Sequence, residues 1–195
     1  MDKLILESWK KPNDSIVKSF AEAFDICFCK DEEELKRLFC DSNVQNDEVL
    51  NNRVRRLNAL YHTHLWGKIT EEIVTFLKAG GAKFEKEIKS GDICAVKKLA
   101  KRERRNCFVF ATKYCSFVAP DKYPIYDSLV VKALLYFHTQ KPLVEGRLSF
   151  ERIRKTYDYA TFKEIVDEFK KQYYLEKCSY KEIDQFLWLV GKNLL

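Results

Sequence analysis

The stretch RRNCFVFATKYCSFV, residues 104–118, constrains the fold of this chain more than any other segment. Its apolar residues are spread around the whole helical turn, so a helix over this stretch would be apolar on nearly every side. Such a helix is stable in water only when other elements surround it. The sequence therefore predicts a central, buried helix that ends at Ala119-Pro120-Asp121.

The flanking regions repeat apolar residues at spacings of three and four, which is typical of amphipathic helices. The predicted stripes lie within 17–28, 35–39, 50–61, 69–77, 130–137, 162–169 and 183–190, and shorter helices are expected over 82–89 and 91–101. We expect Gly80-Gly81 to end the fourth stripe. No segment shows convincing strand alternation, and the loops at 41–45 and 139–148 have the short length normal within a bundle. We expect a single all-α domain over residues 1–195, a compact bundle of about ten helices.

Composition narrows the class of protein. The chain has 195 residues, of which 46% are hydrophobic, so it can bury a substantial core. A formal net charge of +6 favours an anionic partner without requiring one. The seven cysteines are odd in number and form no CxxC pair, which argues against a zinc or disulfide framework and against a disulfide-linked partner. Without a signal peptide or a run of about 20 apolar residues, the sequence predicts a cytoplasmic protein with no membrane association.

Metal and cofactor sites are not indicated. On a helix His62 and His64 would point roughly 200° apart and would not share an ion. The sequence also lacks the glycine-rich nucleotide motifs and the GxSxG hydrolase motif. We therefore expect neither a metal nor a cofactor.

A basic run, KKLAKRERR, leads into the predicted central helix. It is either a solvated helix end and turn, or a set of phosphate contacts where free backbone N–H groups at the helix N-terminus favour an anion. The candidate DNA-binding residues are Lys97, Lys98, Lys101, Arg102, Arg104 and Arg105. Further basic residues that could add to them are Arg53, Arg55, Arg56, Arg147, Arg152, Arg154 and Lys155.

The segment YPIYDS, residues 123–128, places an aspartate where a new helix begins. Asp127 is expected to cap that helix by accepting hydrogen bonds from its first backbone N–H groups. The same position also suits a carboxylate that takes part in chemistry. Lys113, in the middle of the central helix, either extends its ammonium group to solvent or faces Asp127 partly desolvated.

An apolar helix, a short proline loop and an aspartate at the head of the next helix resemble the helix-hairpin-helix DNA glycosylase superfamily. The stretch YPIYDSLVVKAL is similar to the family's motif around its catalytic aspartate, with Pro124, Ile125, Asp127 and Val130 matching. LNALYHTHL is similar to the family's early helix that lines the DNA groove, and the resemblance spans residues 46–138. The glycine-rich hairpin of the family is missing, since no glycine lies between Gly91 and Gly146. No lysine stands at 104–107, where the Schiff-base lysine would fall.

The resemblance implies a glycosylase-like fold and DNA as the partner. It implies a monofunctional enzyme that flips a base out of the helix and hydrolyses its N-glycosidic bond, while Asp127 stabilises the sugar cation. The implied pocket residues are Asn58, Tyr61, His62, Trp66, Lys113, Tyr123 and Tyr126.

Two other interpretations remain open. The chain is either a nucleic-acid-binding module of the same fold without catalysis, or an all-α interaction protein in which Asp127 is only a cap. Trp188 lies off the apolar stripe of the last helix and either packs against the segment around Trp9 or forms a pocket wall. The sequence indicates neither the target base nor the oligomeric state.

Overall fold

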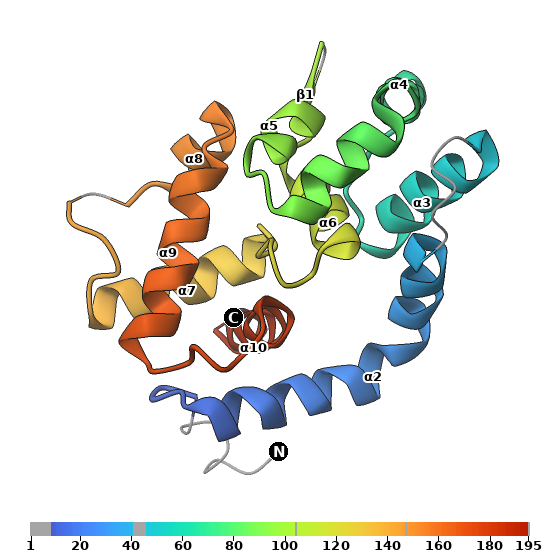
Figure 1. Cartoon of the computed structure of the whole chain (residues 1–195). Coiled ribbons are helices and arrows are strands. Elements are labelled where there is room, and N and C mark those ends of the chain that lie inside the picture. The colour runs from blue at the N-terminus through green and yellow to red at the C-terminus, as the bar shows by residue number, and fades with distance from the viewer. Residues whose placement is uncertain (1–8, 41–45, 104, 147, 195) are drawn as a thin grey trace.

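The computed structural model describes residues 9–40, 46–103, 105–146 and 148–194. Within these ranges nine helices and one two-stranded hairpin form the fold, which confirms the predicted all-α class (Figure 1). The helices are α2 (Asp14–Cys40), α3 (Asp47–Leu60), α4 (Lys68–Ser90), α5 (Cys94–Ala100), α6 (Phe108–Val118), α7 (Ser128–Gln140), α8 (Phe150–Thr156), α9 (Tyr159–Gln172) and α10 (Tyr180–Asn193). The strands are β1 (Lys101–Arg102) and β2 (Arg105–Asn106).

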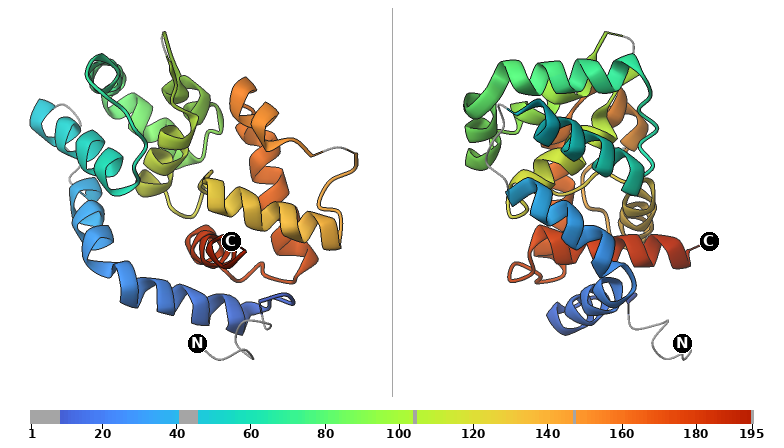
Figure 2. Two further views of the ribbon diagram at one scale, coloured as in Figure 1. Left: turned by 180° about the vertical axis from the view of Figure 1, so that it is seen from behind. Right: turned by 90° about the vertical axis from the view of Figure 1, so that its right-hand side faces the viewer.

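Helix α6 is the central element, as its apolar sequence predicts. It packs against α2, α3, α4 and α5, and it lies in the middle of the molecule in both figures (Figures 1 and 2). Eight of its eleven residues are buried, including the polar side chains of Thr112, Lys113 and Ser116. A helix that buries charge in this way must supply partners for it, and this requirement positions the site described below.

The predicted start of α6 at residue 104 is wrong. Strands β1 and β2 form an antiparallel hairpin in which Lys101 pairs with Asn106 and Arg102 pairs with Arg105. The Cys107 N–H group closes the hairpin by donating to the Ala100 carbonyl at 2.9 Å. The Asn106 side chain then accepts from the Phe108 N–H group at 2.9 Å. The helix begins at Phe108 because Arg105 and Asn106 are paired in the hairpin and Cys107 forms the N-cap.

Residues 14–40 form one continuous helix, α2, which carries the first two predicted stripes. The predicted break at Gly80-Gly81 is confirmed, because two helical stretches within α4 meet at a kink where Gly81 leaves the helical conformation. Its φ of 49° and ψ of −143° are open to glycine without steric cost. The structure also adds a helix that we did not predict, α8, whose first turn is capped by the Ser149 hydroxyl accepting from the Arg152 N–H group.

The first and last described helices lie side by side. Helix α10 packs against both α2 and α7 (Figure 2). At Gly191 the contact with α7 is so close that an added Cβ would lie 2.1 Å from the Leu129 carbonyl oxygen. Trp9 packs on Tyr136 and Phe137 of α7, not on Trp188. Trp188 is therefore available to form the wall of a cavity between α2 and α10.

Candidate functional site

The YPIYDS segment is fixed in place by tyrosine hydroxyl groups. Tyr123 donates to the Asp92 carbonyl and Tyr126 donates to the Phe150 carbonyl, each at 2.9 Å. Tyr159 donates to the Pro124 carbonyl, also at 2.9 Å. The Tyr126 N–H group donates to the Thr112 hydroxyl of α6 at 3.1 Å. Because buried bonds run from this segment to α6, α8 and α9, the backbone that carries Asp127 is held rigidly.

Asp127 is the N-cap of α7, as predicted. Its Oδ1 accepts from the Leu129 N–H group at 3.0 Å. Its Oδ2 forms an ion pair with Lys113 Nζ of α6 at 2.8 Å. The Lys113 side chain is 3% exposed and that of Asp127 is 17% exposed. The alternative in which Lys113 extends to solvent is therefore wrong, because its ammonium group is desolvated and paired inside the protein.

The ion pair forms part of the wall of a cavity of about 210 Å³. An apolar cavity of about 150 Å³ is large enough for a benzene ring, whereas sites for drug-sized ligands occupy about 300–1,000 Å³. This cavity therefore fits one small aromatic molecule. It is lined by Phe24, Phe28, Glu32, Leu60, Tyr61, His62, Lys113, Ile125, Asp127, Asp184 and Trp188.

One side of the cavity is an aromatic wall, formed by Phe24 and Phe28 of α2 with Trp188 of α10. The Trp188 ring meets Phe24 and Phe28 edge-on, with centroids 5.5 and 5.6 Å apart. Lys192, which is exposed one turn further along α10, lies over Trp188 at 5.1 Å. A planar ligand can pack against such a wall, and Lys192 places a positive charge beside it.

Tyr61 links the two halves of the cavity. Lys113 Nζ lies over the Tyr61 ring in a cation–π contact, 4.3 Å from the ring centroid. Its hydroxyl donates to Glu32 Oε1 of α2 at 3.1 Å, and the same oxygen accepts from Lys181 Nζ of α10. Burial, followed by the negative charge of Glu32, raises the pKa of Tyr61 well above its usual value. Tyr61 therefore stays protonated near neutral pH and acts as a hydrogen-bond donor.

Asp184 supplies a third carboxyl group. Burial raises its pKa to about 7, Lys181 opposes this shift, and the negative charge of Asp127 adds to it. The Asp184 Oδ1 atom is buried without a hydrogen-bond partner. The carboxyl groups of Glu32, Asp127 and Asp184 outnumber the ammonium groups of Lys113 and Lys181, so the cavity gains a net negative charge as Asp184 ionises above about pH 7.

The loop before α4 forms the edge of the cavity. His62 and His64 have positive φ values of 46° and 54°, which are uncommon for residues other than glycine. Asn58 braces this loop, since its side chain accepts from Leu65 N and donates to Leu65 O, each at 2.9 Å. Strained backbone of this kind is concentrated at binding and catalytic sites.

The structure separates the predicted pocket residues into two groups. Tyr61, His62, Lys113 and Asp127 meet around the cavity. Tyr123 and Tyr126 are core residues, 0% and 6% exposed, and do not reach it because backbone carbonyls hold their hydroxyl groups elsewhere. Asn58 supports the loop, and Trp66 is 70% exposed and is not among the lining residues.

Two acidic lining residues, Glu32 and Asp184, were missed by the sequence analysis, whereas Trp188 takes the pocket-wall position that was one of its two predicted alternatives. Glu32 occupies the apolar stripe of α2, between Phe28 and Leu35, where a hydrophobic residue would continue the pattern. Asp184 and Trp188 are one helical turn apart and share a face of α10. A carboxylate within an apolar stripe is the signal that would have identified Glu32.

Five of the six predicted DNA-binding residues lie on α5 and the two strands, at the far end of the molecule from α10 (Figure 1). Lys97, Lys101 and Arg105 are exposed, whereas Arg104 lies outside the described residues. Lys98 is paired with Glu87 at 2.7 Å. The Arg102 guanidinium stacks over Phe76 at 4.2 Å and also donates to the Leu99 carbonyl.

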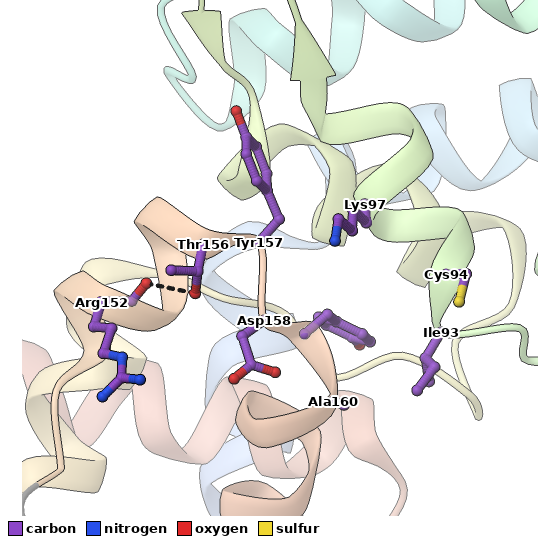
Figure 3. Close-up of a pocket in the computed structure, with 9 residues that line it drawn as sticks. Ile93, Cys94, Lys97, Arg152, Thr156, Tyr157, Asp158 and Ala160 are labelled. Carbon is purple, nitrogen blue, oxygen red and sulfur yellow. Dashed lines mark hydrogen bonds between the residues drawn. The ribbon is translucent and has the colours of Figure 1, made fainter.

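A second, wider cleft of about 430 Å³ lies between α5 and the turn that joins α8 to α9 (Figure 3). Lys97 and Arg152, from two separate basic segments, both line it. The Asn106 side chain of the hairpin donates to the Arg154 carbonyl at 2.6 Å, which ties this basic surface together. By contrast, Arg53 is fully buried and donates to carbonyls of α2, so the expectation that it adds to a phosphate-binding surface is wrong.

Other classes of site are absent from the described part of the chain. Residues 9–40, 46–103, 105–146 and 148–194 contain no group of three or more histidine, cysteine or acidic side chains placed to hold a metal ion. Within the same ranges, no helix is both long and apolar enough to cross a membrane.

Comparison with known proteins places the chain in a family. The sequence profile HI_0787_N, described as an N-terminal domain, matches residues 5–122. An uncharacterized protein of Haemophilus influenzae (strain ATCC 51907 / DSM 11121 / KW20 / Rd) is 37% identical over 114 residues, which are 56% of this chain and 51% of that protein. The match thus spans about half of the relative's length, and no solved structure matches the chain.

The matched region includes Glu32, Tyr61, His62 and Lys113 but ends before Asp127. The cavity is therefore built partly from the family's N-terminal domain and partly from helices that follow it. Because the profile covers more than half of the chain, this protein belongs to the HI_0787_N family.

Proposed function

We propose that this protein binds DNA and hydrolyses the N-glycosidic bond of a base that is flipped into the 210 Å³ cavity. The observation that carries the proposal is the position of Asp127. Its carboxylate is rigidly held by Lys113 and by the α7 backbone, and it lies in the wall of an aromatic cavity that fits one ring system. A flipped base stacks on aromatic side chains in enzymes that act on bases.

The charges of the cavity suit this reaction. Cleavage of an N-glycosidic bond develops positive charge on the sugar, and a carboxylate already fixed beside that charge lowers the barrier without having to reorganise. Asp127 takes this role, and Glu32 and Asp184 add negative potential. The C–N bond breaks with its electron pair going to the base. Water then adds to C1′, its lost proton passes to solvent, and the base takes up a proton.

Further positive charges of the protein lie outside the cavity. Lys192 at the aromatic wall is placed to contact a phosphate next to the flipped nucleotide. The surface formed by Lys97, Lys101, Arg105 and Arg152 is placed to contact a more distant part of the duplex. Such contacts release counterions, so the affinity for DNA should fall steeply with salt. We infer a cytoplasmic setting, which suits the free thiols of Cys107, Cys115 and Cys178.

The test is mass spectrometry of bases released from damaged, deaminated and modified DNA. We expect the wild type to release a specific base and Asp127→Asn to release none, while both bind DNA equally well. Asparagine is also a good N-cap, so circular dichroism should show that the helices are retained. Asp121→Asn, an exposed change in the same loop, is the matched control and should leave base release unchanged.

The two alternative functions give different results in this experiment. Salt-sensitive DNA binding without base release by the wild type would identify a binding module on which catalysis is absent. No salt-dependent binding at all would identify an interaction protein, in which Asp127 serves only to cap α7.

A further inference from the structure

Two carboxylate oxygens in the cavity have no hydrogen-bond partner. Glu32 is 4% exposed, and while its Oε1 accepts from Tyr61 and Lys181, its Oε2 is buried and unpaired. Asp184 Oδ1 is also buried and unpaired. An unpaired buried acceptor costs about 1–3 kcal/mol, and more when it is charged. Native proteins keep few such groups, and those that they keep call for an explanation.

The donors of Lys113 and Tyr61 in the cavity are already engaged. Lys113 donates to Asp127 Oδ2 and lies on the Tyr61 ring, while the Tyr61 hydroxyl donates to Glu32 Oε1. Above about pH 7 Asp184 is ionised, and an ionised carboxylate can only accept hydrogen bonds. The free groups on α2 and α10 are therefore complementary to a ligand that carries N–H donors.

We propose that the cavity selects a guanine-type base, whose neighbouring ring N–H and exocyclic NH₂ groups donate to Glu32 Oε2 and Asp184 Oδ1. This inference rests on the proposed function in taking the occupant to be a nucleobase. Thymine and uracil present one ring N–H group between two carbonyl oxygens, which the carboxylates would repel. Adenine and cytosine place a ring acceptor beside their amino group. Only the guanine-type edge offers donors side by side.

The specificity can be measured without relying on base release. Isothermal titration calorimetry of the full chain with deoxyguanosine, deoxyinosine and thymidine compares three defined probes. Deoxyinosine lacks only the exocyclic amino group, so it tests a single hydrogen bond. We expect deoxyguanosine to bind roughly 10- to 100-fold more tightly than deoxyinosine, because the missing donor leaves a buried charged acceptor unpaired. Thymidine should bind more weakly still.

Two variants identify the groups responsible. Glu32→Gln and Asp184→Asn preserve side-chain shape but place an amide where a carboxylate stood, so each should reduce deoxyguanosine affinity to about that of deoxyinosine. If loss of the Lys181 contact prevents Glu32→Gln from folding, Asp184→Asn serves in its place, because the ion pair of Lys181 is with Glu32. Glu33→Gln, an exposed change on α2, is the matched control and should keep the preference.

Equal affinity for deoxyguanosine and deoxyinosine, or no binding of either at millimolar concentration, would overturn the inference. The base-release assay separates its failure from that of the proposed function. If the protein released bases but did not prefer deoxyguanosine, the proposed glycosylase function would stand and the guanine specificity would be wrong. If it preferred deoxyguanosine but released no base, the binding site would stand and the proposed catalysis would be wrong.

Discussion

At the scale of single residues, the buried ion pair of Lys113 and Asp127 both stabilises the fold and orients the carboxylate of the proposed reaction. The two groups come from α6 and α7, and their 2.8 Å contact holds Asp127 Oδ2 while the α7 backbone holds Oδ1. Both oxygens thus have donors, which holds the carboxylate in one orientation. The same arrangement that ties two helices together also orients the group proposed to act on the sugar.

Removing one member of this pair should destabilise the protein more than removing both. Lys113→Met leaves Asp127 partly buried without its cation, and we expect it to lower the free energy of unfolding by about 3 kcal/mol. Urea denaturation of Lys113→Met, Asp127→Asn and the double variant gives the coupling energy between them. Additive effects of the two substitutions would contradict the interaction. Lys132→Met, on the partly exposed side of α7, is a control for loss of a lysine.

Asp184 should make stability depend on pH. Its folded-state pKa is about 7, above its value in the unfolded chain, so the folded state holds a proton that the unfolded state has released. This stabilisation is fully present below the ordinary aspartate pKa, near 4, and is lost as pH rises towards 7. Asp184→Asn has no charge to bury and should be more stable than the wild type at pH 8, with a smaller difference at pH 5. Urea midpoints at the two pH values measure this, and a pH-independent difference would exclude the effect.

At the scale of elements, the sequence predicts helices better than their ends. The apolar stripes of α3, α9 and α10 and the all-round apolar pattern of α6 are sufficient to identify those helices, because burial follows their period. The hairpin was not predicted, since KRERRN has none of the β-branched or aromatic residues that mark strands. Its geometry depends on contacts made by Ala100, Asn106 and Cys107 rather than on propensity.

In the site, too, the sequence predicts the residues that have a local signal and not those that packing brings together. Asp127 could be predicted because its capping role is local, and Tyr61, His62 and Lys113 because they fall in recognisable segments. Glu32 and Asp184 are about 150 residues apart and meet only because α2 and α10 pack side by side. Periodicity shows which face of each helix is buried but not which helices will be neighbours, so these lining residues could not be assigned.

The hairpin should contribute to DNA affinity chiefly through charge. In Lys101→Gln/Arg105→Gln two exposed cations are lost without loss of a packed side chain. If both contact phosphates, the slope of log affinity against log salt should become shallower by about 1.8, at roughly 0.9 per phosphate. Fluorescence anisotropy with a labelled duplex measures the slope. Lys36→Gln/Arg37→Gln on α2 removes equal charge elsewhere and should leave the slope unchanged if the hairpin is the contact.

Gly191 tests how closely α10 must approach α7. Alanine is the better helix former by about 1 kcal/mol, so propensity alone predicts that Gly191→Ala is stabilising. Its Cβ would lie 2.1 Å from the Leu129 carbonyl oxygen, which belongs to backbone and cannot rotate away. We expect the clash to dominate and thermal unfolding to show a destabilisation of about 1–3 kcal/mol. Asn193→Ala, exposed on the same helix, should be close to neutral, and a stabilised Gly191→Ala would show that the two helices separate at little cost.

At the scale of the whole molecule, the cavity requires both ends of the chain. Phe24 and Glu32 come from α2, Asp184 and Trp188 come from α10, and Asp127 begins α7. The family profile ends at residue 122, so the region it describes contains Lys113 without its ion-pair partner. Any activity of this cavity should therefore belong to the longer chain rather than to the matched region alone.

A truncated chain tests whether the region up to residue 122 folds by itself. Without residues 123–195, the apolar face of α2 loses the contact with α10, and α6 loses the Tyr126 and Asp127 bonds to Thr112 and Lys113. An ammonium group left buried without its partner adds a further cost. We expect residues 1–122 alone to lack a cooperative thermal transition and to be cleaved readily by protease, while the full chain resists. A fragment that melted as sharply as the full chain would instead make the N-terminal region an autonomous domain, and the cavity would then lie at an interface between two folding units.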